Sequence, residues 1–465
     1  MRILLINPNF RRMIGKSERI STILPPLGLA CIAAALKKEK IDVKILDINA
    51  LNLSMEETIS YIGGYKPDIA GLTAATPTIN ECFNIAEAAK KANPKIKAVI
   101  GGPHPTALPE ESIKKDFIDF VVIGEGEETM LELAREIKNG KKDFKKIRGL
   151  VFKDRGKIIK NAARERIKDL DALPFPAFEL LPLDRYISAS SKYKRFITIL
   201  TSRGCPGQCN YCNKLIFGNA CNMRSAENII GEIEFLMKRY GYREFHIVDD
   251  LFTINRKRIV DFCNFVLEKN IRIKWKCGNG VRVGTVDLEL LRLMKKAGCY
   301  SLSYGIESGN QKILNNIRKG QALQQCINAV RWTKQAGIEC VGFFMLGNLG
   351  EDEKTMQETI DFAKSLELDI AQFSILIPFP GTPIRQIIEK EGKIFESNWE
   401  NYDNLEGKAI FEHGGLKREI MERMHKKAYK EFYMRPKYML KRLFKFRTLN
   451  EIKNEINGFL TLMEY

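Results

Sequence analysis

Short apolar runs alternate with helical patterns over the first part of the chain. The runs that we interpret as strands lie at residues 2–7, 43–47, 69–74, 97–102 and 119–125. Between them, segments such as GLACIAAALKKE and INECFNIAEAAKKA carry their apolar residues on one helical face. Apolar strands separated by helices predict a parallel sheet that is covered on both faces. We therefore predict an α/β fold that begins with a doubly wound, five-stranded parallel sheet over residues 1–138.

Small and polar residues directly follow three of these predicted strands. In doubly wound sheets ligands bind beyond the carboxyl ends of the strands, and glycine there lets the backbone approach a ligand closely. The stretches are TAATPTI (73–79), GGPHPT (101–106) and GEGEE (124–128). The candidate cofactor-binding residues within them are Thr73, Thr76, Gly101, Gly102, His104, Gly124 and Gly126.

A second alternation begins after a break in the pattern. Residues 139–190 are predicted to be a linker, because a basic segment precedes a strap whose prolines prevent a regular helix. The strands of the second alternation lie near 196–201, 244–248, 271–276, 299–304, 339–345 and 370–376. Because helical segments separate them, the pattern predicts a partial (β/α)6 barrel of the TIM type over residues 191–410. Function is then expected at the C-terminal ends of its strands.

Length and composition agree with a two-domain chain. A chain of 465 residues exceeds what one hydrophobic core organises, and 45% hydrophobic residues suffice for two cores. We expect no signal peptide and no membrane span, because the first residues read as a strand and no run of about 18 apolar residues occurs. Most of the eleven cysteines stand singly among apolar neighbours, as reduced buried thiols do, which points to the cytoplasm.

Three cysteines stand close together in the stretch TSRGCPGQCNYCNK, residues 201–214. Cys205, Cys209 and Cys212 form the pattern C-x3-C-x2-C directly after the first strand of the predicted barrel. Zinc fits poorly, because a structural zinc site usually takes four ligands in two close pairs and Cys221 lacks a pairing partner. A disulfide is disfavoured in a reducing compartment. The spacing favours a 4Fe-4S cluster with three cysteine ligands and one iron open to a substrate or cofactor.

With Tyr211 before the last cysteine, the motif resembles the signature of the radical SAM superfamily. The stretches that fit the same resemblance are HIVDDLFT, YGIESGNQKIL, IRKG, VGFFMLGNLGE and ILIPFPGTP. The resemblance implies that the open iron binds S-adenosylmethionine (SAM) and that an electron from an external donor of the flavodoxin or ferredoxin type leads to a 5′-deoxyadenosyl radical. It makes Tyr211 a residue of the cofactor site. Glu307 and Ser308 become candidates for the ribose and amino-acid end of SAM, and Arg318 for its carboxylate.

The first domain resembles the cobalamin-binding domain that precedes many radical SAM barrels. The stretches that carry this resemblance are PPLGLACIAAALKKEKIDVKILD, GGPHPTALPEE and VIGEGEET. Together the two resemblances cover almost the whole chain. None of the four histidines stands in the D-x-H-x-x-G motif that places histidine on cobalt in some of these domains. His104 is accordingly expected to be a loop residue near the corrin rather than a cobalt ligand.

The pairing of the two domains implies an enzyme that uses cobalamin as methyl carrier for C-methylation of an unactivated carbon. One SAM would methylate cobalamin, and a second would give the radical that abstracts hydrogen from the substrate. The sequence singles out no catalytic acid or base. Cobalamin-containing radical SAM cyclases and ring-rearranging enzymes stay open as alternatives, as does a non-catalytic cobalamin or iron–sulfur carrier. A methylthiotransferase is close to excluded, because residues 1–190 hold only Cys31 and Cys82.

The C-terminal region, residues 411–465, is predicted to be helical and basic. Half of the net charge of +18 lies in residues 417–447, which hold twelve Lys or Arg against three Glu. We favour a helical cap on the barrel with a solvated basic face, and the alternative is an amphipathic helix in peripheral contact with a membrane. No nucleic-acid partner is expected, because no recognised binding motif accompanies the charge. A small molecule, a lipid and a peptide all fit as substrate.

Overall fold

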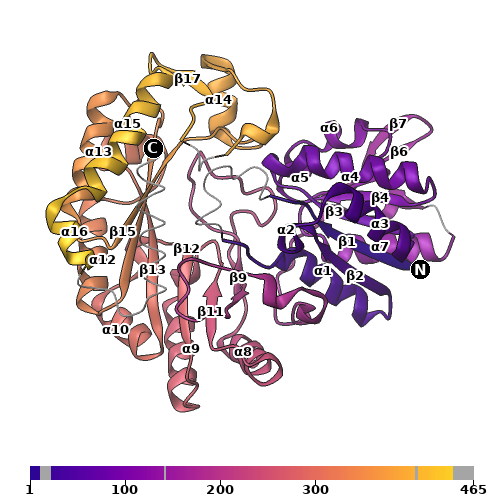
Figure 1. The fold of residues 1–465 in the computed structure, drawn as a ribbon, viewed down its shortest axis with the longest axis horizontal. Coiled ribbons are helices and arrows are strands. Elements are labelled where there is room, and N and C mark those ends of the chain that lie inside the picture. The colour runs from indigo at the N-terminus through magenta and orange to yellow at the C-terminus, as the bar shows by residue number, and fades with distance from the viewer. Residues whose placement is uncertain (11–21, 141–142, 404–406, 444–465) are drawn as a thin grey trace.

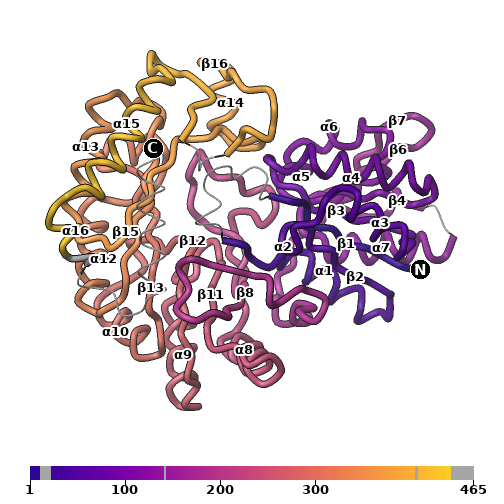
Figure 2. The backbone as a smooth tube through the Cα atoms, in the orientation of Figure 1, coloured from indigo at the N-terminus to yellow at the C-terminus, as the bar shows by residue number. Residues whose placement is uncertain are grey.

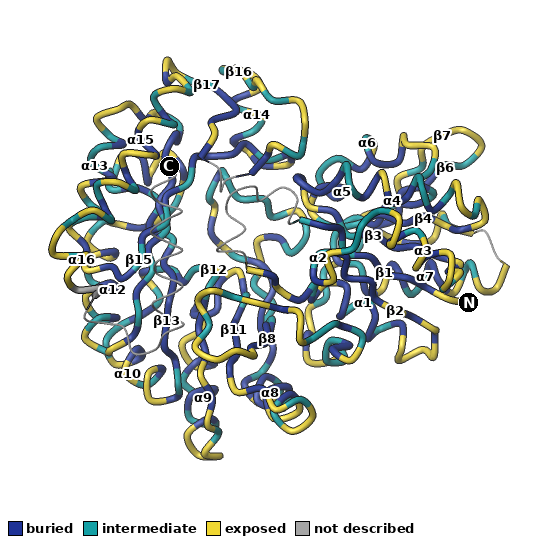
Figure 3. The backbone as a smooth tube through the Cα atoms, viewed as in Figure 1, coloured by how far each residue is buried: buried dark blue, intermediate teal, exposed yellow. Residues whose placement is uncertain are grey.

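The computed structural model describes residues 1–10, 22–140, 143–403 and 407–443. They form two domains that lie side by side, with the N-terminal domain in indigo and purple and the second domain in magenta to yellow (Figure 1). The strands of both domains are largely buried, whereas the outer turns of the surrounding helices are exposed (Figure 3). Among the residues described, no helix is long and apolar enough to cross a membrane.

The sheet of the first domain has seven strands in the order β2-β1-β3-β4-β5-β6-β7. Its strands are β1 (Arg2–Asn7), β2 (Asp42–Asp47), β3 (Ile69–Thr73), β4 (Lys97–Gly101), β5 (Phe120–Val122), β6 (Leu150–Asp154) and β7 (Lys157–Lys160). The first five are parallel, as the sequence predicts. β6 pairs antiparallel with β5, and β7 pairs antiparallel with β6.

The predicted count of five strands is therefore two strands short. β6 and β7 form a hairpin that turns at Arg155 and Gly156, both at positive φ. The last strand, β7, reads KIIK and is mostly exposed at the edge of the sheet. Its lysines discourage pairing with another chain. They also weaken the apolar pattern by which a strand is recognised in the sequence. The sheet thus runs to residue 160, past the predicted end of the domain at residue 138.

Helices cover both faces of this sheet. In β1, Ile3 and Leu5 belong to one apolar layer and Leu4 and Ile6 to the other, since side chains alternate along a strand. α1 (Leu27–Lys38) and α7 (Glu127–Lys138) pack together on the first layer, and α3 (Met55–Tyr65) and α4 (Ile79–Ala92) on the second. The shorter helices are α2 (Ile48–Leu51), α5 (Pro103–Ala107) and α6 (Pro109–Lys114).

The second domain is built on six parallel strands in the order β15-β14-β13-β12-β11-β8. They are β8 (Ile197–Ile199), β11 (Glu244–Ile247), β12 (Lys274–Val281), β13 (Cys299–Glu307), β14 (Glu339–Leu346) and β15 (Ile370–Ile375). The helices between them are α8 (Ala226–Tyr240), α9 (Arg256–Glu268), α10 (Leu288–Lys296), α11 (Gln311–Asn316), α12 (Leu323–Gln335) and α13 (Glu353–Ser365). The open (β/α)6 arrangement is confirmed, with β8 and β15 at its two edges.

The linker between the domains lies on the first domain before it enters the barrel. Ile187 pairs with Ile23, and the Ala177 N–H donates to the Ala30 carbonyl at 3.0 Å. The Tyr186 hydroxyl donates to the buried carboxylate of Asp47, at the end of β2, at 2.9 Å. The linker can be followed in magenta between the two domains in Figure 2.

The C-terminal part caps the barrel. Its elements are α14 (Pro383–Glu391), β16 (Gly392–Ile394), β17 (Phe411–His413), α15 (Arg418–Tyr433) and α16 (Pro436–Leu443). On α15, the Tyr433 hydroxyl donates to the Ala371 carbonyl at 2.7 Å and accepts from the Ala371 N–H at 3.2 Å. Tyr429 makes the same pair of bonds with Phe373, at 3.0 and 3.3 Å. These hydroxyls occupy the open edge of β15, so the helical-cap interpretation is confirmed for α15; residues 444–465 lie outside the described part.

Candidate functional site

The three-cysteine loop follows β8 and a short strand, β9 (Ser202–Arg203), that pairs with β10 (Asn222–Met223). A Cβ atom at Gly207 would lie 3.4 Å from the Cys205 sulfur and 3.9 Å from the Cys209 sulfur. The two sulfurs therefore converge around a position that holds no side chain. All three thiols are free and partly exposed, with no disulfide between them.

The chemistry of this donor set fits a cationic iron–sulfur cluster. Burial, and then the neighbouring Cys209 sulfur, raise the pKa of Cys212 to about 11, so its thiolate needs a positive partner. Among the described residues, no group of three His, Cys, Asp or Glu side chains stands close enough together to hold a single metal ion. A 4Fe-4S cluster binds each cysteine to a different iron, so its ligands stand further apart than those of one ion.

The residues before the first cysteine are anchored one after another to carboxylates. The Thr201 N–H donates to Asp249 at 2.6 Å, and the Ser202 hydroxyl donates to the same carboxylate at 2.6 Å. The Gly204 N–H donates to Asp250 at 2.9 Å. Gly204 has φ +89°, and a Cβ there would lie 2.1 Å from a backbone carbonyl, so only glycine fits. The root of the loop is thereby fixed on the barrel.

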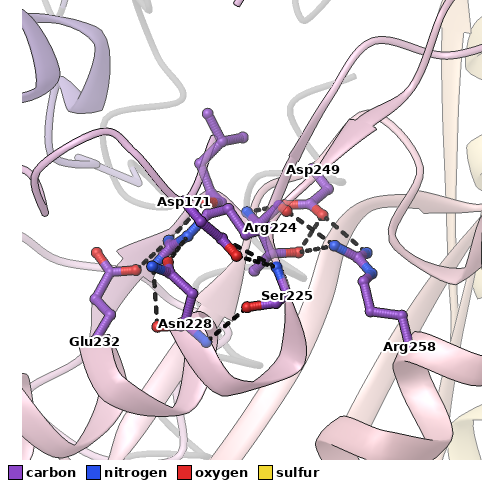
Figure 4. A network of polar contacts seen from close by, with 9 residues as sticks. Asp171, Arg224, Ser225, Asn228, Glu232, Asp249 and Arg258 are labelled. Carbon is purple, nitrogen blue, oxygen red and sulfur yellow. Dashed lines mark hydrogen bonds and ion pairs between the residues drawn. The ribbon is translucent and has the colours of Figure 1, made fainter. Parts of the chain in front are cut away.

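Two buried arginines support this root from within the barrel. Arg258 of α9 donates to the Thr201 carbonyl at 2.9 Å and lies 3.7 Å from Asp249. Arg224 donates to the Leu200 carbonyl at 3.1 Å and pairs with Glu232 of α8. Figure 4 shows the two guanidiniums turned toward these carboxylates.

Arg203, between these anchors, reaches into the other domain. Its Nη1 lies 2.6 Å from Glu125 Oε1, and its Nη2 lies 2.6 Å from Glu127 Oε1. Each of the three side chains is at most 7% exposed. The cysteine loop is thus tied directly to the GEGEE stretch of the first domain, a contact that the sequence did not reveal.

Beside the cysteines, Lys319 is the cation that the sequence analysis missed. Its Nζ lies 2.7 Å from Glu307 Oε1 and 3.2 Å from the Tyr211 hydroxyl. Burial alone lowers the pKa of Lys319, but the Glu307 carboxylate outweighs it and leaves that pKa above its usual value. Glu307 itself has φ +67°, a strained conformation of the kind that concentrates at functional sites.

The other candidates for the SAM site are placed differently from one another. The Arg318 side chain is exposed, so Lys319, its neighbour in the IRKG stretch, is better placed for a carboxylate. Ser308 is fully buried, and its hydroxyl contacts the Thr359 hydroxyl at 3.0 Å and accepts from the Asn310 N–H at 3.1 Å. These bonds favour a role for Ser308 in shaping the strand end. All of these assignments stay predictions.

Arg282 is a second residue without a sequence signal. Its Nη2 donates to the carbonyls of Lys319, at 2.9 Å, and Gly320, at 2.6 Å. The Cβ position of Gly207 lies 3.5 Å from its Nη1. Arg282 therefore joins the turn that carries Lys319 to the cysteine loop.

The predicted cofactor-binding residues of the first domain gather at the carboxyl edge of its sheet. Thr73 ends β3, and Gly101 ends β4. A Cβ at Gly102 would lie 2.8 Å from the Ala74 carbonyl, and one at Gly126 would lie 2.8 Å from Ile32 of α1. Those two glycines are needed for packing within the domain.

Gly124 is different, because no atom of the residues that the structure describes lies within 4 Å of the position a Cβ would take there. Its φ is +78°, and its N–H donates to the Thr106 hydroxyl at 3.1 Å. The open space at this sheet edge, next to a loop tied to the cysteine root, fits a planar cofactor that approaches the backbone.

His104 lies in helix α5 and not in a loop, because Pro103 begins a short helical turn there. It is fully buried, and its Nδ1 lies 3.2 Å from the Thr76 hydroxyl. Its ring packs edge-on against Trp399 at 5.1 Å, and the Trp399 Nε1–H donates to Glu111 at 2.8 Å. The short helix η9 (Trp399–Asn401) of the C-terminal part thus docks on the first domain.

A buried polar cluster lies at the opposite end of the barrel, where the strands begin. Glu244 accepts from the Tyr300 hydroxyl at 2.6 Å, and its Oε1 lies 2.9 Å from His246 Nε2. It also accepts the backbone N–H of Lys192 at 3.0 Å. The cluster holds the loop before β8 against the base of the barrel, away from the cysteines.

Comparison with known proteins agrees with both halves of this site. Residues 18–134 match the family described as B12 binding domain, and residues 199–363 match the radical SAM superfamily. An uncharacterized methyltransferase of Pyrococcus horikoshii is 35% identical over 99% of this chain and 98% of its own length. The anaerobic magnesium-protoporphyrin IX monomethyl ester cyclase of Rubrivivax gelatinosus is 30% identical over 86% of this chain and 72% of its own.

The fold is similar to that of a solved radical S-adenosylmethionine methyltransferase, TsrM from Kitasatospora setae, with cobalamin and a [4Fe-4S] cluster bound. The TM-score is 0.74 at 16% identity, and the match covers 100% of this chain and 98% of the other. At this identity the likeness establishes the fold.

Proposed function

Because the chain belongs to the radical SAM enzymes that carry an N-terminal B12-binding domain, we propose that it methylates an unactivated carbon of its substrate. The cofactors of the family are a 4Fe-4S cluster, SAM and cobalamin. When bound, the cluster and SAM supply a carbon-centred radical, and cobalamin carries the methyl group. The observation that supports the proposal most directly is the buried contact of Arg203 with Glu125 and Glu127, which brings the two cofactor loops together.

The described residues of the barrel offer ligands for the cluster and for one end of SAM. We assign cluster binding to Cys205, Cys209 and Cys212, since thiolate sulfur is a soft ligand for iron and the sulfurs of Cys205 and Cys209 both lie near Gly207. We assign the amino-acid end of SAM to Lys319 and Glu307, which offer one positive and one negative group side by side.

On the first domain, we assign the corrin to the sheet edge at Gly124, whose open side can receive a flat ring. The other candidates at that edge would shape it from behind; they are Thr73, Thr76, Gly101, Gly102 and Gly126. His104 is covered by Trp399 and is therefore assigned to domain docking.

A cyclase is the second candidate, because one relative of this chain is named as a cyclase and shares both domains over most of its length. The two reactions differ in the fate of the substrate radical. We also propose an external one-electron donor of the flavodoxin or ferredoxin type and a small-molecule, lipid or peptide substrate. Membrane contact through the basic C-terminal region stays the alternative to a solvated basic face.

The proposal is tested with anaerobically reconstituted protein, hydroxocobalamin, SAM and a chemical reductant. We expect about one cobalamin per chain, and formation of both 5′-deoxyadenosine and S-adenosylhomocysteine. Release of 5′-deoxyadenosine without S-adenosylhomocysteine, in protein that holds cobalamin, would favour the cyclase. Binding of both cofactors without any SAM turnover would favour the carrier.

A further inference from the structure

The two proposed cofactor sites are joined through three buried side chains. Arg203 stands two residues before Cys205, and Glu125 directly follows Gly124 in the chain. Both carboxylates bind the same guanidinium, each at 2.6 Å. A path of only a few residues therefore runs from the cysteine loop to the open sheet edge.

Both ends of this path are held firmly. On the barrel side, the neighbours of Arg203 in the chain are bound to Asp249 and Asp250. On the other side, the second oxygen of Glu125 accepts the Ile167 N–H at 2.9 Å, and Glu127 is the first residue of α7. A shift of the cysteine loop is therefore passed to the Gly124 loop, because hydrogen bonds hold both ends of the contact in place.

The contact is also sensitive to alignment. One guanidinium faces two carboxylates in a buried site, and the planar fork of arginine holds both at once in a way that lysine cannot. A carboxylate that lost its partner here would stay buried without water, which is strongly unfavourable. The contact thus favours one relative position of the two loops over all others.

We infer that Arg203 is a positioning residue that couples the two cofactor sites, so that filling the cluster site raises the affinity of the chain for cobalamin. A bound cluster would fix the position of Cys205, two residues from Arg203, and Arg203 would pass that position on to the Gly124 loop. A ligand that fixes one loop in its binding position thereby favours the binding position of the other, which is positive coupling between the two sites. The inference rests on the proposed function, because it requires cobalamin to bind at the Gly124 edge.

The test compares the dissociation constant for hydroxocobalamin, measured by equilibrium dialysis, in protein with and without the reconstituted cluster. Arg203→Lys keeps the charge and removes the fork. Arg164→Lys is the matched control, because the Arg164 guanidinium also holds two carboxylates, those of Glu128 and Glu132, but inside the first domain. Iron content and melting temperature are recorded for each protein.

We expect the cluster to tighten cobalamin binding by at least about fivefold, the lower end of common coupling strengths, in the wild type and in Arg164→Lys. In Arg203→Lys the ratio should fall below about twofold while the iron content is kept. A ratio that persists in Arg203→Lys, or that is absent from the wild type, overturns the coupling.

Two further outcomes are separable. If the cluster-loaded wild type binds no hydroxocobalamin, the proposed function fails and the coupling fails with it. If Arg203→Lys loses iron or unfolds, Glu127→Gln replaces it, since Arg203 then keeps Glu125. A ratio below that of the wild type in Glu127→Gln supports the coupling, and an unchanged ratio overturns it.

Discussion

The guanidinium of Arg203 and the carboxylate of Glu125 lie 2.6 Å apart, although 78 residues of chain and a domain boundary separate them. Both side chains are almost fully buried. This contact sets how the cysteine loop faces the carboxyl edge of the first sheet, where the proposed reaction takes place. The two sides of the contact can be tested separately.

Removal of any one cluster ligand should remove the iron. Cys205→Ala, Cys209→Ala and Cys212→Ala are each expected to lower the iron content from about four per chain to near zero. Cys277→Ala is the buried control and Cys221→Ala the nearby one, and both should keep their iron. Iron analysis after anaerobic reconstitution decides, and loss of iron in Cys221→Ala would contradict the three-ligand assignment.

Lys319, and not Arg318, should determine SAM affinity. Lys319→Met removes the ammonium beside Glu307 and Tyr211, and we expect SAM binding to weaken about tenfold or more, since a charge-assisted contact contributes about 1.5–3 kcal/mol. Arg318→Met should change it less than twofold because that side chain is exposed. Calorimetry on cluster-loaded protein measures both. The reverse order of effects would restore Arg318 as the carboxylate-binding residue.

A side chain at Gly124 should block cobalamin without disturbing the fold. Asparagine tolerates positive φ, so Gly124→Asn fills the open space at little conformational cost, and we expect cobalamin affinity to fall about tenfold or more. Gly156→Asn is the control, because Gly156 has φ +79° and equally open surroundings in the β6–β7 turn. Unchanged affinity in Gly124→Asn would place the corrin elsewhere.

Trp399 should help to hold the two domains together through its contacts with Glu111 and His104. Trp399→Ala loses the hydrogen bond to Glu111 and the ring contact with His104, a loss of about 2 kcal/mol. We expect faster hydrogen exchange in α5 and α6 and a larger radius of gyration in X-ray scattering. Trp332→Ala, on α12 of the barrel, should show neither change, and equal behaviour of the two variants would argue against docking by Trp399.

Acid should destabilise the base of the barrel. Burial, the largest cause, lowers the pKa of His246 to about 4 from its ordinary 6.5, so the unfolded chain binds more protons between these values. Stability is therefore lost as the pH falls from about 6.5 to about 4, by roughly 3 kcal/mol from this group. The pKa of Glu244 is also lowered, by its bonds to His246 and Tyr300 against the effect of burial, and acts in the same direction.

His246→Gln should flatten that dependence. The melting temperature of the cluster-free chain, followed from pH 7 to pH 4.5, should fall less steeply in this variant than in the wild type. His413→Gln, which changes a histidine outside the buried polar cluster of Glu244, should keep the wild-type slope. Parallel slopes for wild type and His246→Gln would remove His246 as the cause.

The sequence predicts the strands and the cysteine loop well, because both are encoded locally. The apolar run of β1 packs on both faces of its sheet, so its signal is continuous, and the three cysteines stand within eight residues of each other. β7 was missed because an exposed edge strand has little apolar signal of its own. Arg203 and Trp399 escaped prediction for another reason, since each meets its partners only after the two domains have docked.

The different placement of Arg318 and Lys319 has a geometric cause. Two adjacent basic residues offer the same signal in sequence, but Arg318 sits at φ +54° in the turn after α11. That turn leaves the first side chain in solvent and directs the second toward Glu307. Which of two adjacent basic side chains points toward Glu307 depends on one backbone angle, and the residue types in the sequence do not predict that angle.

Two tyrosines of α15 bond to the edge of β15, the last strand of the barrel, and the distance between them along the helix matches the distance between alternate residues of the strand. Four residues of helix rise about 6.0 Å, and two residues of parallel strand rise about 6.6 Å, so Tyr429 and Tyr433 meet Phe373 and Ala371 in step. The match depends on helical phase, since deletion of one residue between the tyrosines would swing one hydroxyl by about 100° away from the sheet. The spacing of the two tyrosines thus decides whether the backbone groups at the edge of β15 are bonded within the chain or stay open to a strand of another chain.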